Sequence, residues 1–207
     1  MIKQMWILIN YFLFFFFQVS AVANVNSFTS PSCFSMGGAG SLFSSANTQI
    51  KNPAVLDKSR SITTSIVKYP SLINSQSVNI NLPNDNTVFS ASLKYLSYGA
   101  FKGYNQFGED IGTYRSYETW VDGYLAKQIK PHSVFIGSSI CFKSSNFHIE
   151  KIKTLSTSLG LIKQFKNKNN AIGFSINYIG LTFSNRKLSV TSPNFILGGS
   201  KKLKYLP

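Results

Sequence analysis

The chain has 207 residues, enough for one domain of ordinary size with little room for a second. Hydrophobic residues make up 43% and charged residues 14%, which is too apolar for a disordered tail and too polar for a bundle of membrane helices. Lysine and arginine outnumber aspartate and glutamate by 21 to 7, but the basic residues are spread thinly and no nucleic-acid-binding motif accompanies them. We therefore expect a globular domain or a β-type membrane protein with no nucleic-acid partner.

Residues 1–23 have the pattern of a secretory signal peptide. Lys3 supplies the positive charge, an apolar core runs from Met5 to Phe17, and Ala21-Val22-Ala23 forms a small-x-small cleavage site. An uncleaved membrane anchor is the alternative, although the apolar run is short for a bilayer span. We expect an exported protein whose mature chain begins near Asn24 and contains no transmembrane helix.

Residues 24–59 form a segment rich in small residues. It contains Gly37, Gly38 and Ala39, followed by the run Asn52-Pro53-Ala54. Such a density of glycine and serine favours irregular, closely packed backbone, and Asn-Pro favours a turn. The segment has too few large apolar residues for a core of its own, so we expect it to fold inward against the next part of the chain.

From residue 60 onward, apolar and polar residues alternate with a period of two, which is typical of β-strands with one apolar face. The polar positions carry small or hydrogen-bonding groups, as in the lumen of a transmembrane barrel whose apolar face meets lipid. The residues predicted to face lipid are Val78, Ile80, Leu82, Phe89, Leu93, Ile136, Ile140, Ile172, Phe174 and Ile176.

The lengths of the strands and connections agree with a membrane barrel. Thr87–Leu96, Ser133–Lys143 and Ala171–Leu181 each run for about ten residues, the length of a tilted membrane strand. Residues 83–86, 130–132 and 167–170 read as tight turns, whereas 97–113 and 182–190 read as longer external loops. We predict about eight strands within residues 60–207. A soluble β-sandwich remains an alternative.

No arrangement of side chains predicts catalysis, a cofactor or a metal site. Cys33 and Cys141 lack metal or redox spacing, and either a bridge between them or two free thiols is compatible with export. Glu118 and Asp122 lie on one strand face about 13 Å apart, too far for a glycosidase pair. We expect them to form salt bridges with lysines in the lumen, in a protein that is not an enzyme.

Four segments resemble the PorV and PorQ outer-membrane proteins of the type IX secretion system, relatives of the FadL-type channels. The most specific is the run from Leu93 to Asn105 with Gly112-Thr113-Tyr114, similar to the PorQ-type Y-x-x-Y-G-x-F-x-G-Y-D and G-x-F. The others are residues 35–40, 52–56 and 176–181, the last together with the closing residues 204–207. The resemblance implies a plug containing Gly37, Gly38, Ala39, Asn52, Pro53 and Ala54, and an external loop containing Tyr98, Gly99, Phe101, Gly103 and Tyr104.

The resemblance also implies a place and a role. The place would be the bacterial outer membrane, in contact with its lipid, and the role non-enzymatic, in type IX secretion or attachment of cargo to the surface, with secretion proteins or cargo as partners. A FadL-like channel for hydrophobic small molecules is the main alternative, and a soluble periplasmic binding module is another. Family barrels have about fourteen strands, so we expect this chain to correspond to the N-terminal part of a longer protein or to a truncated product. Its sheet would stay open near residues 60–69 and 191–203.

Overall fold

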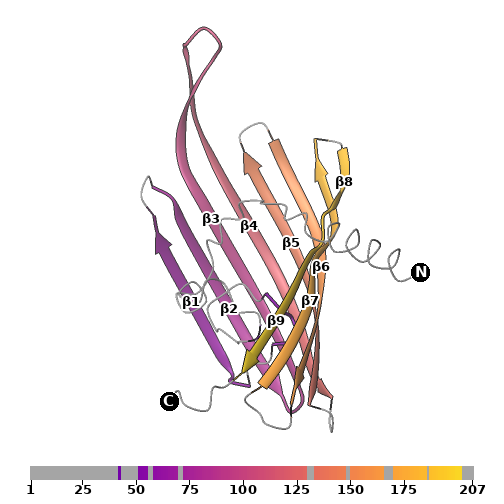
Figure 1. Ribbon diagram of the computed structural model, residues 1–207. Helices are drawn as coiled ribbons and strands as arrows, with labels where there is room; N and C mark the ends of the chain where they lie inside the picture. Colours follow the sequence, from indigo (N-terminus) through magenta and orange to yellow (C-terminus); the bar gives the residue numbers. More distant parts are fainter. Residues whose placement is uncertain are drawn as a thin grey trace, which may run out of the picture.

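The structure, a computed structural model, is all-β and consists of one antiparallel sheet (Figure 1). It describes residues 42, 51–55, 58–69, 72–129, 133–147, 150–165, 170–185 and 187–201. Within these ranges, no helix has the length and apolar character needed to cross a membrane. The predicted signal peptide and the first part of the predicted plug lie outside the described residues.

Within the described residues, nine strands make up the sheet. They are β1 (Ser61–Lys68), β2 (Asn74–Asn84), β3 (Thr87–Tyr104), β4 (Asp110–Ile129), β5 (Val134–Phe147), β6 (Glu150–Gln164), β7 (Asn170–Ser184), β8 (Lys187–Thr191) and β9 (Asn194–Lys201).

The strands follow one another in an up-and-down order from β1 to β8, and each pairs with the next. The exception is β9, which also pairs with β7. β8 lies beside residues 180–184 of β7 and β9 beside residues 170–177, with Pro193 between them. Because β8 and β9 pair with different stretches of the same strand, they occupy one position in the sheet. The break between them falls at Pro193, because a proline has no N–H to donate to the ladder. The prediction of about eight strands therefore agrees with eight sheet positions.

The predicted alternation of faces is confirmed over most of the sheet. Of the ten residues predicted to face lipid, nine are between 38% and 58% exposed, and Ile176 is half-buried. Large apolar side chains stand in register across the outward face. One row runs across eight strands: Thr64, Val78, Leu93, Val121, Phe142, Leu155, Leu181 and Val190.

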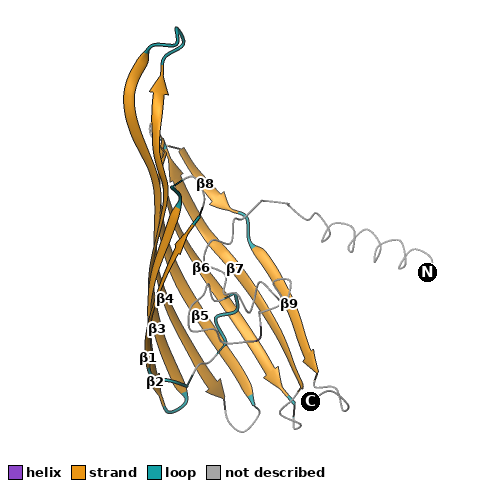
Figure 2. Cartoon of the chain, turned by 90° about the vertical axis from the view of Figure 1, so that its left-hand side faces the viewer, coloured by secondary structure: helices purple, strands orange, loops and turns teal. Residues whose placement is uncertain are grey.

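The opposite face, which we call the inner face, is polar and largely buried. One of its rows contains Thr63, Asn79, Ser92, Asp122, Cys141, Ser156, Gly180 and Thr191. Twelve of the buried polar residues are Ser, Asn, Lys, Glu or Asp in the strands, and a few buried apolar residues, among them Val88, Leu96 and Phe135, lie beside them. The curvature of the sheet and the shared tilt of its strands are seen from the side in Figure 2.

The two predicted long loops are corrected by the structure. The segment 97–113 is mostly strand, because β3 continues to Tyr104 and β4 begins at Asp110, and this hairpin projects beyond its neighbours (Figure 1). A register shift between Ser97 and Ala100 and a left-handed Gly99 (φ 89°) form an irregularity at which the strand bends while its pairing with β4 continues. The segment 182–190 is also a hairpin, since only residues 185 and 186 separate β7 from β8.

Continued along β7, the period of two would also place Tyr178 on the face of Ile172 and Phe174, and this expectation is wrong: Tyr178 does not share the outward face. β7 holds one extra residue opposite Ser158 of β6, and Tyr178 has a φ of 64°. This bulge moves the outward positions from even to odd numbers, so that Ile179, Leu181 and Phe183 are exposed. Gly180 fits beside it because any Cβ there would overlap the carbonyl oxygen of Leu155.

The sheet does not close on itself, as expected. Among the described residues, β1 pairs only with β2, and β8 and β9 pair only with β7. The two edges therefore fall at the predicted positions, near residues 60–69 and 191–203.

Candidate functional site

The short segment 51–55 lies deep against the inner face. Asn52 and Ala54 are each 1% exposed, and Pro53 is among the most fully buried side chains. Ala54 forms a small apolar cluster with Phe135 of β5 and Ile162 of β6, against which Leu42 and Val55 also pack. Three of the six predicted plug residues are thus brought together on the sheet, while Gly37, Gly38 and Ala39 lie outside the described residues.

Three glycines of the sheet make room for this segment and for Leu42. Gly137 and Gly160 are register partners in β5 and β6, and Gly173 lies in the neighbouring strand β7. A Cβ atom on Gly137 would overlap the backbone of Pro53, one on Gly160 would overlap the Asn52 side chain, and one on Gly173 would overlap Leu42. We call these three residues the glycine pocket. It allows backbone and side chain of the segment to approach the sheet more closely than any other residue type would permit.

Hydrogen bonds hold the segment at the glycine pocket. The Asn52 side-chain amide donates to the carbonyl oxygen of Phe174 at 3.3 Å, and its oxygen accepts from the backbone N–H of Ala54 at 2.9 Å. The carbonyl oxygen of Lys51 accepts from the Ser175 hydroxyl at 3.1 Å and from the Asn177 amide at 3.0 Å. An asparagine is suited to position 52 because one side chain can both close an Asx turn and donate to the sheet.

Sequence reasoning identifies the segment but misses its receptor. It places Ser175 and Asn177 on the polar face only as lumen residues, and it does not identify the glycine pocket. The pattern that could have revealed the pocket is a small residue at the same register position of three neighbouring strands. Gly137, Gly160 and Ser175 are direct partners across β5, β6 and β7 on the inner face. Detecting it requires the strand register, which the sequence alone does not provide.

Substitution of Gly137 tests the contact. We expect Gly137→Ala to destabilise the fold by about 1–3 kcal/mol, because the added methyl group must displace backbone atoms of Pro53 and Ala54. Gly123→Ala is the matched control, since its Cβ would meet only Ile140 at 3.6 Å, an ordinary contact. Urea unfolding gives the stabilities, and limited proteolysis near residue 52 should be faster in Gly137→Ala alone. Equal effects of the two substitutions would contradict close packing of Pro53 on Gly137.

Two ion pairs between described residues lie on the inner face, and they include Glu118 and Asp122, as the sequence predicted. Lys94 Nζ is 2.6 Å from Asp122 Oδ2 with both side chains 5% exposed, and the Ser92 hydroxyl donates to the same oxygen at 2.9 Å. Lys143 Nζ is 2.9 Å from Glu118 Oε1 and lies 5.0 Å from the centre of the Trp120 ring. These charges neutralise one another within the sheet, and their separation offers no paired carboxylates for catalysis.

The projecting end of the β3–β4 hairpin carries aromatic side chains. Phe101 and Tyr114 stack across it with centroids 5.4 Å apart, whereas Tyr104 and Phe107 are 59% and 79% exposed. The five residues predicted for the external loop all lie on β3, which runs to Tyr104. Tyr98 and Gly99 lie at the base of the hairpin, and Gly103 lies near its tip. Burial raises the pKa of Tyr98, and the nearby Glu118 carboxylate raises it further. Tyr98 is therefore a neutral hydroxyl.

Asn105 shapes the tip of the hairpin. Its side-chain oxygen accepts from the N–H groups of Phe107 and Glu109, both at 2.9 Å, and its amide donates to the Glu109 carboxylate at 2.6 Å. Gly108, with a φ of 81°, completes the turn. The exposed aromatic groups are thus presented on an ordered hairpin, which suits protein recognition better than a flexible loop does.

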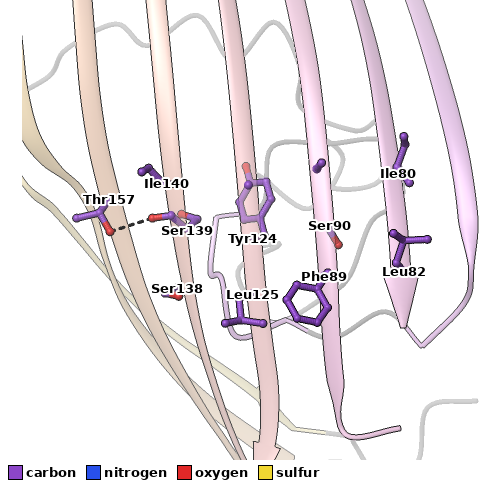
Figure 3. A pocket seen from close by; sticks show the side chains of 12 residues that line it. Ile80, Leu82, Phe89, Ser90, Tyr124, Leu125, Ser138, Ser139, Ile140 and Thr157 are labelled. Carbon is purple, nitrogen blue, oxygen red and sulfur yellow. Dashed lines mark hydrogen bonds between the residues drawn. The ribbon is translucent and has the colours of Figure 1, made fainter. Parts of the chain in front are cut away.

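A hollow of about 560 Å³ opens on the outward face among Ile80, Phe89 and Ile140 (Figure 3). The directly paired residues Ala91 and Gly123 also line it. Small side chains there leave a depression among the larger Ile80, Phe89 and Ile140. The hollow lies on the opposite side of the sheet from residues 51–55. It is therefore not the pocket between plug and wall that a channel for hydrophobic compounds requires.

Comparisons with known proteins gave no match: no family model, no curated protein and no solved structure is similar to this chain. Among the described residues, no group of three or more histidine, cysteine, aspartate or glutamate side chains is placed to hold a metal ion. Cys141 is a free thiol, and Cys33, His132 and His148 lie outside the described residues.

Proposed function

We propose that the nine strands form part of the wall of a β-barrel in the bacterial outer membrane, with residues 51–55 belonging to an inward plug. The role is non-enzymatic, in type IX secretion or in attachment of cargo to the cell surface. The resemblance to the PorV and PorQ proteins supports this role, and the burial of Asn52-Pro53-Ala54 at the glycine pocket supports the plug.

The observation that carries the membrane proposal is the distribution of charge on the outward face. On β6, Lys153 and Lys163 share this face, and only Leu155, Thr157, Leu159 and Leu161 lie between them on it. The ten residue steps from Lys153 to Lys163 extend over about 33 Å of strand, or roughly 23 Å along the membrane normal at a 45° tilt. This height matches the apolar band of about 25 Å on outer-membrane barrels.

Neighbouring strands continue the same band. Three successive rows of the outward face contain no charged residue in any described strand. They are the row that contains Val78 and Leu93, the row Ile62, Ile80, Ala91, Gly123, Ile140, Thr157 and Ile179, and the row Leu82, Phe89, Leu125, Ser138, Leu159, Ile176 and Phe195. A soluble sheet with so many exposed large apolar side chains would need a second layer to cover them.

The alternatives have less support. A soluble sandwich needs a second sheet, and the described residues form a single one. A channel for hydrophobic molecules needs an apolar interior, whereas the inner face carries serines, asparagines and two ion pairs. Edge groups left unpaired in lipid cost several kcal/mol each, so in the proposed barrel the two edges must pair in the membrane, with each other or with further strands.

Fractionation tests the proposal. The protein produced with its own N-terminus in a bacterium with an outer membrane should stay in the membrane pellet through carbonate and high-salt washes and should need detergent for release. Release by either wash would contradict the proposal and favour the soluble sandwich.

A further inference from the structure

The outward face carries a compact group of hydrogen-bond donors at the border of the apolar band nearer the β3–β4 hairpin. Tyr117 of β4, Asn146 of β5 and Lys151 of β6 are direct neighbours in one row of the sheet. Lys153 lies two residues further along β6 on the same face, so the Cα atoms of Lys151 and Lys153 are about 6.6 Å apart along the strand. We call these four residues the border patch.

The border patch is arranged to donate. The Asn146 amide donates to Tyr117 Oη at 3.2 Å, which leaves the hydroxyl proton of Tyr117 free to point outward. Lys151 and Lys153 are both exposed, and among the described residues neither pairs with an acid. Two ammonium groups, a hydroxyl and an amide therefore face one region of the surface.

Among the described residues, the acidic side chains lie away from the border patch. Of the described acidic residues, Glu118 and Asp122 lie on the inner face, Glu150 shares the face of Ile152, and Asp85, Glu109 and Asp110 lie at hairpin ends. On the other side of the border patch lie Leu155 and Phe142, in the uncharged row. A ligand here would place an anion on the lysines and an apolar chain along the band.

We propose that the border patch binds the phosphate of a membrane lipid headgroup whose acyl chain lies along the outward apolar face. This inference rests on the proposed membrane function. A phosphate diester matches the paired ammonium groups and the Tyr117 hydroxyl in charge and in hydrogen bonding, and lysines beside an anionic bilayer surface are favourable. The aromatic pair Tyr95 and Tyr117, with centroids 5.9 Å apart, lies at the same border, as in the aromatic girdles of barrels.

Lipid titration of the full chain in detergent tests the proposal. Native mass spectrometry would give the dissociation constant for phosphatidylglycerol, with phosphatidylcholine and inorganic phosphate as comparison probes. We expect the variant K151Q/K153Q to bind phosphatidylglycerol about 5- to 25-fold more weakly, the effect of one to two lysines at an anionic surface. The control K102Q/K187Q removes the same charge elsewhere on described strands and should change binding less than about twofold. Inorganic phosphate should bind far more weakly than the lipid, because it lacks the acyl chain.

Equal losses in the two double variants would overturn the proposal, because they would show a diffuse effect of net charge. Phosphate binding as tight as lipid binding would overturn it in favour of a simple anion site. Insertion into phosphatidylcholine vesicles is scored separately by heat-modifiable migration in electrophoresis. Insertion with no preference for the anionic lipid overturns the headgroup site alone, whereas failure to insert in any vesicle overturns the proposed membrane function as well.

Discussion

Replacement of Asp122 by asparagine is expected to cost about 3–5 kcal/mol of stability, more than we expect for Gly137→Ala. The substitution removes the carboxylate that lies 2.6 Å from the Lys94 ammonium group, at a position where both side chains are only 5% exposed. Denaturant unfolding of the protein in detergent micelles or vesicles measures the loss.

Glu118→Gln is the matched control for this prediction. It breaks the second ion pair, but the Lys143 side chain is 35% exposed and can reach water, so we expect a loss of about 1 kcal/mol. Removing both charges of the buried pair, in Lys94→Met with Asp122→Leu, should recover most of the stability lost by Asp122→Asn, because no uncompensated charge remains. Equal losses for Asp122→Asn and Glu118→Gln would contradict the buried environment of the first pair.

The second large effect concerns two consecutive residues of β2 on opposite faces. Ile80 lies on the outward face in the middle of the three uncharged rows and is 38% exposed, whereas Asn79 lies on the polar inner face. In lipid, Ile80→Arg should destabilise the protein by about 2–4 kcal/mol, the cost of an arginine near the bilayer midplane. Asn79→Arg should cost much less, because the side chain enters a polar surface.

The same pair of variants separates a membrane wall from a soluble sheet. If the outward face met water, Ile80→Arg would be a substitution at a partly exposed position and would change stability by about 0.5 kcal/mol or less. Unfolding of both variants from vesicles measures the difference. Arginine substitutions at the neighbouring residues Phe174 and Ser175 would distinguish the two faces less clearly. Ser175 is fully buried beneath Lys51, so Ser175→Arg would also be destabilising.

Much of the sheet could be predicted from residue alternation. The period of two assigned Phe89, Leu93 and Ile140 to the outward face correctly, because side chains on a strand alternate strictly. The prediction failed where the backbone departs from that period. At Tyr178 one inserted residue reverses the faces, and no local composition marks the insertion until the partner strand is known.

The long loops were predicted wrongly for a related reason. Glycine and aromatic residues in the segment 97–113 resemble loop composition, yet Gly99 and Gly112 take positive φ angles that let a long hairpin bend while its pairing continues. The glycine pocket could not be found from sequence because its members come from three strands. Only the register that pairs Gly137 with Gly160 reveals one surface for Pro53.

Accessibility of single spin labels along β2 tests most directly whether the outward face meets lipid. Cysteines placed one at a time from 76 to 83, in a protein with Cys33 and Cys141 replaced by serine, would be labelled in vesicles and exposed to oxygen and to a water-soluble nickel complex. We expect oxygen accessibility to peak at positions 78, 80 and 82 and to fall at 77, 79 and 81, with the nickel complex excluded from the first set. High nickel accessibility at positions 78, 80 and 82 would show that this face lies in water and would contradict a membrane wall.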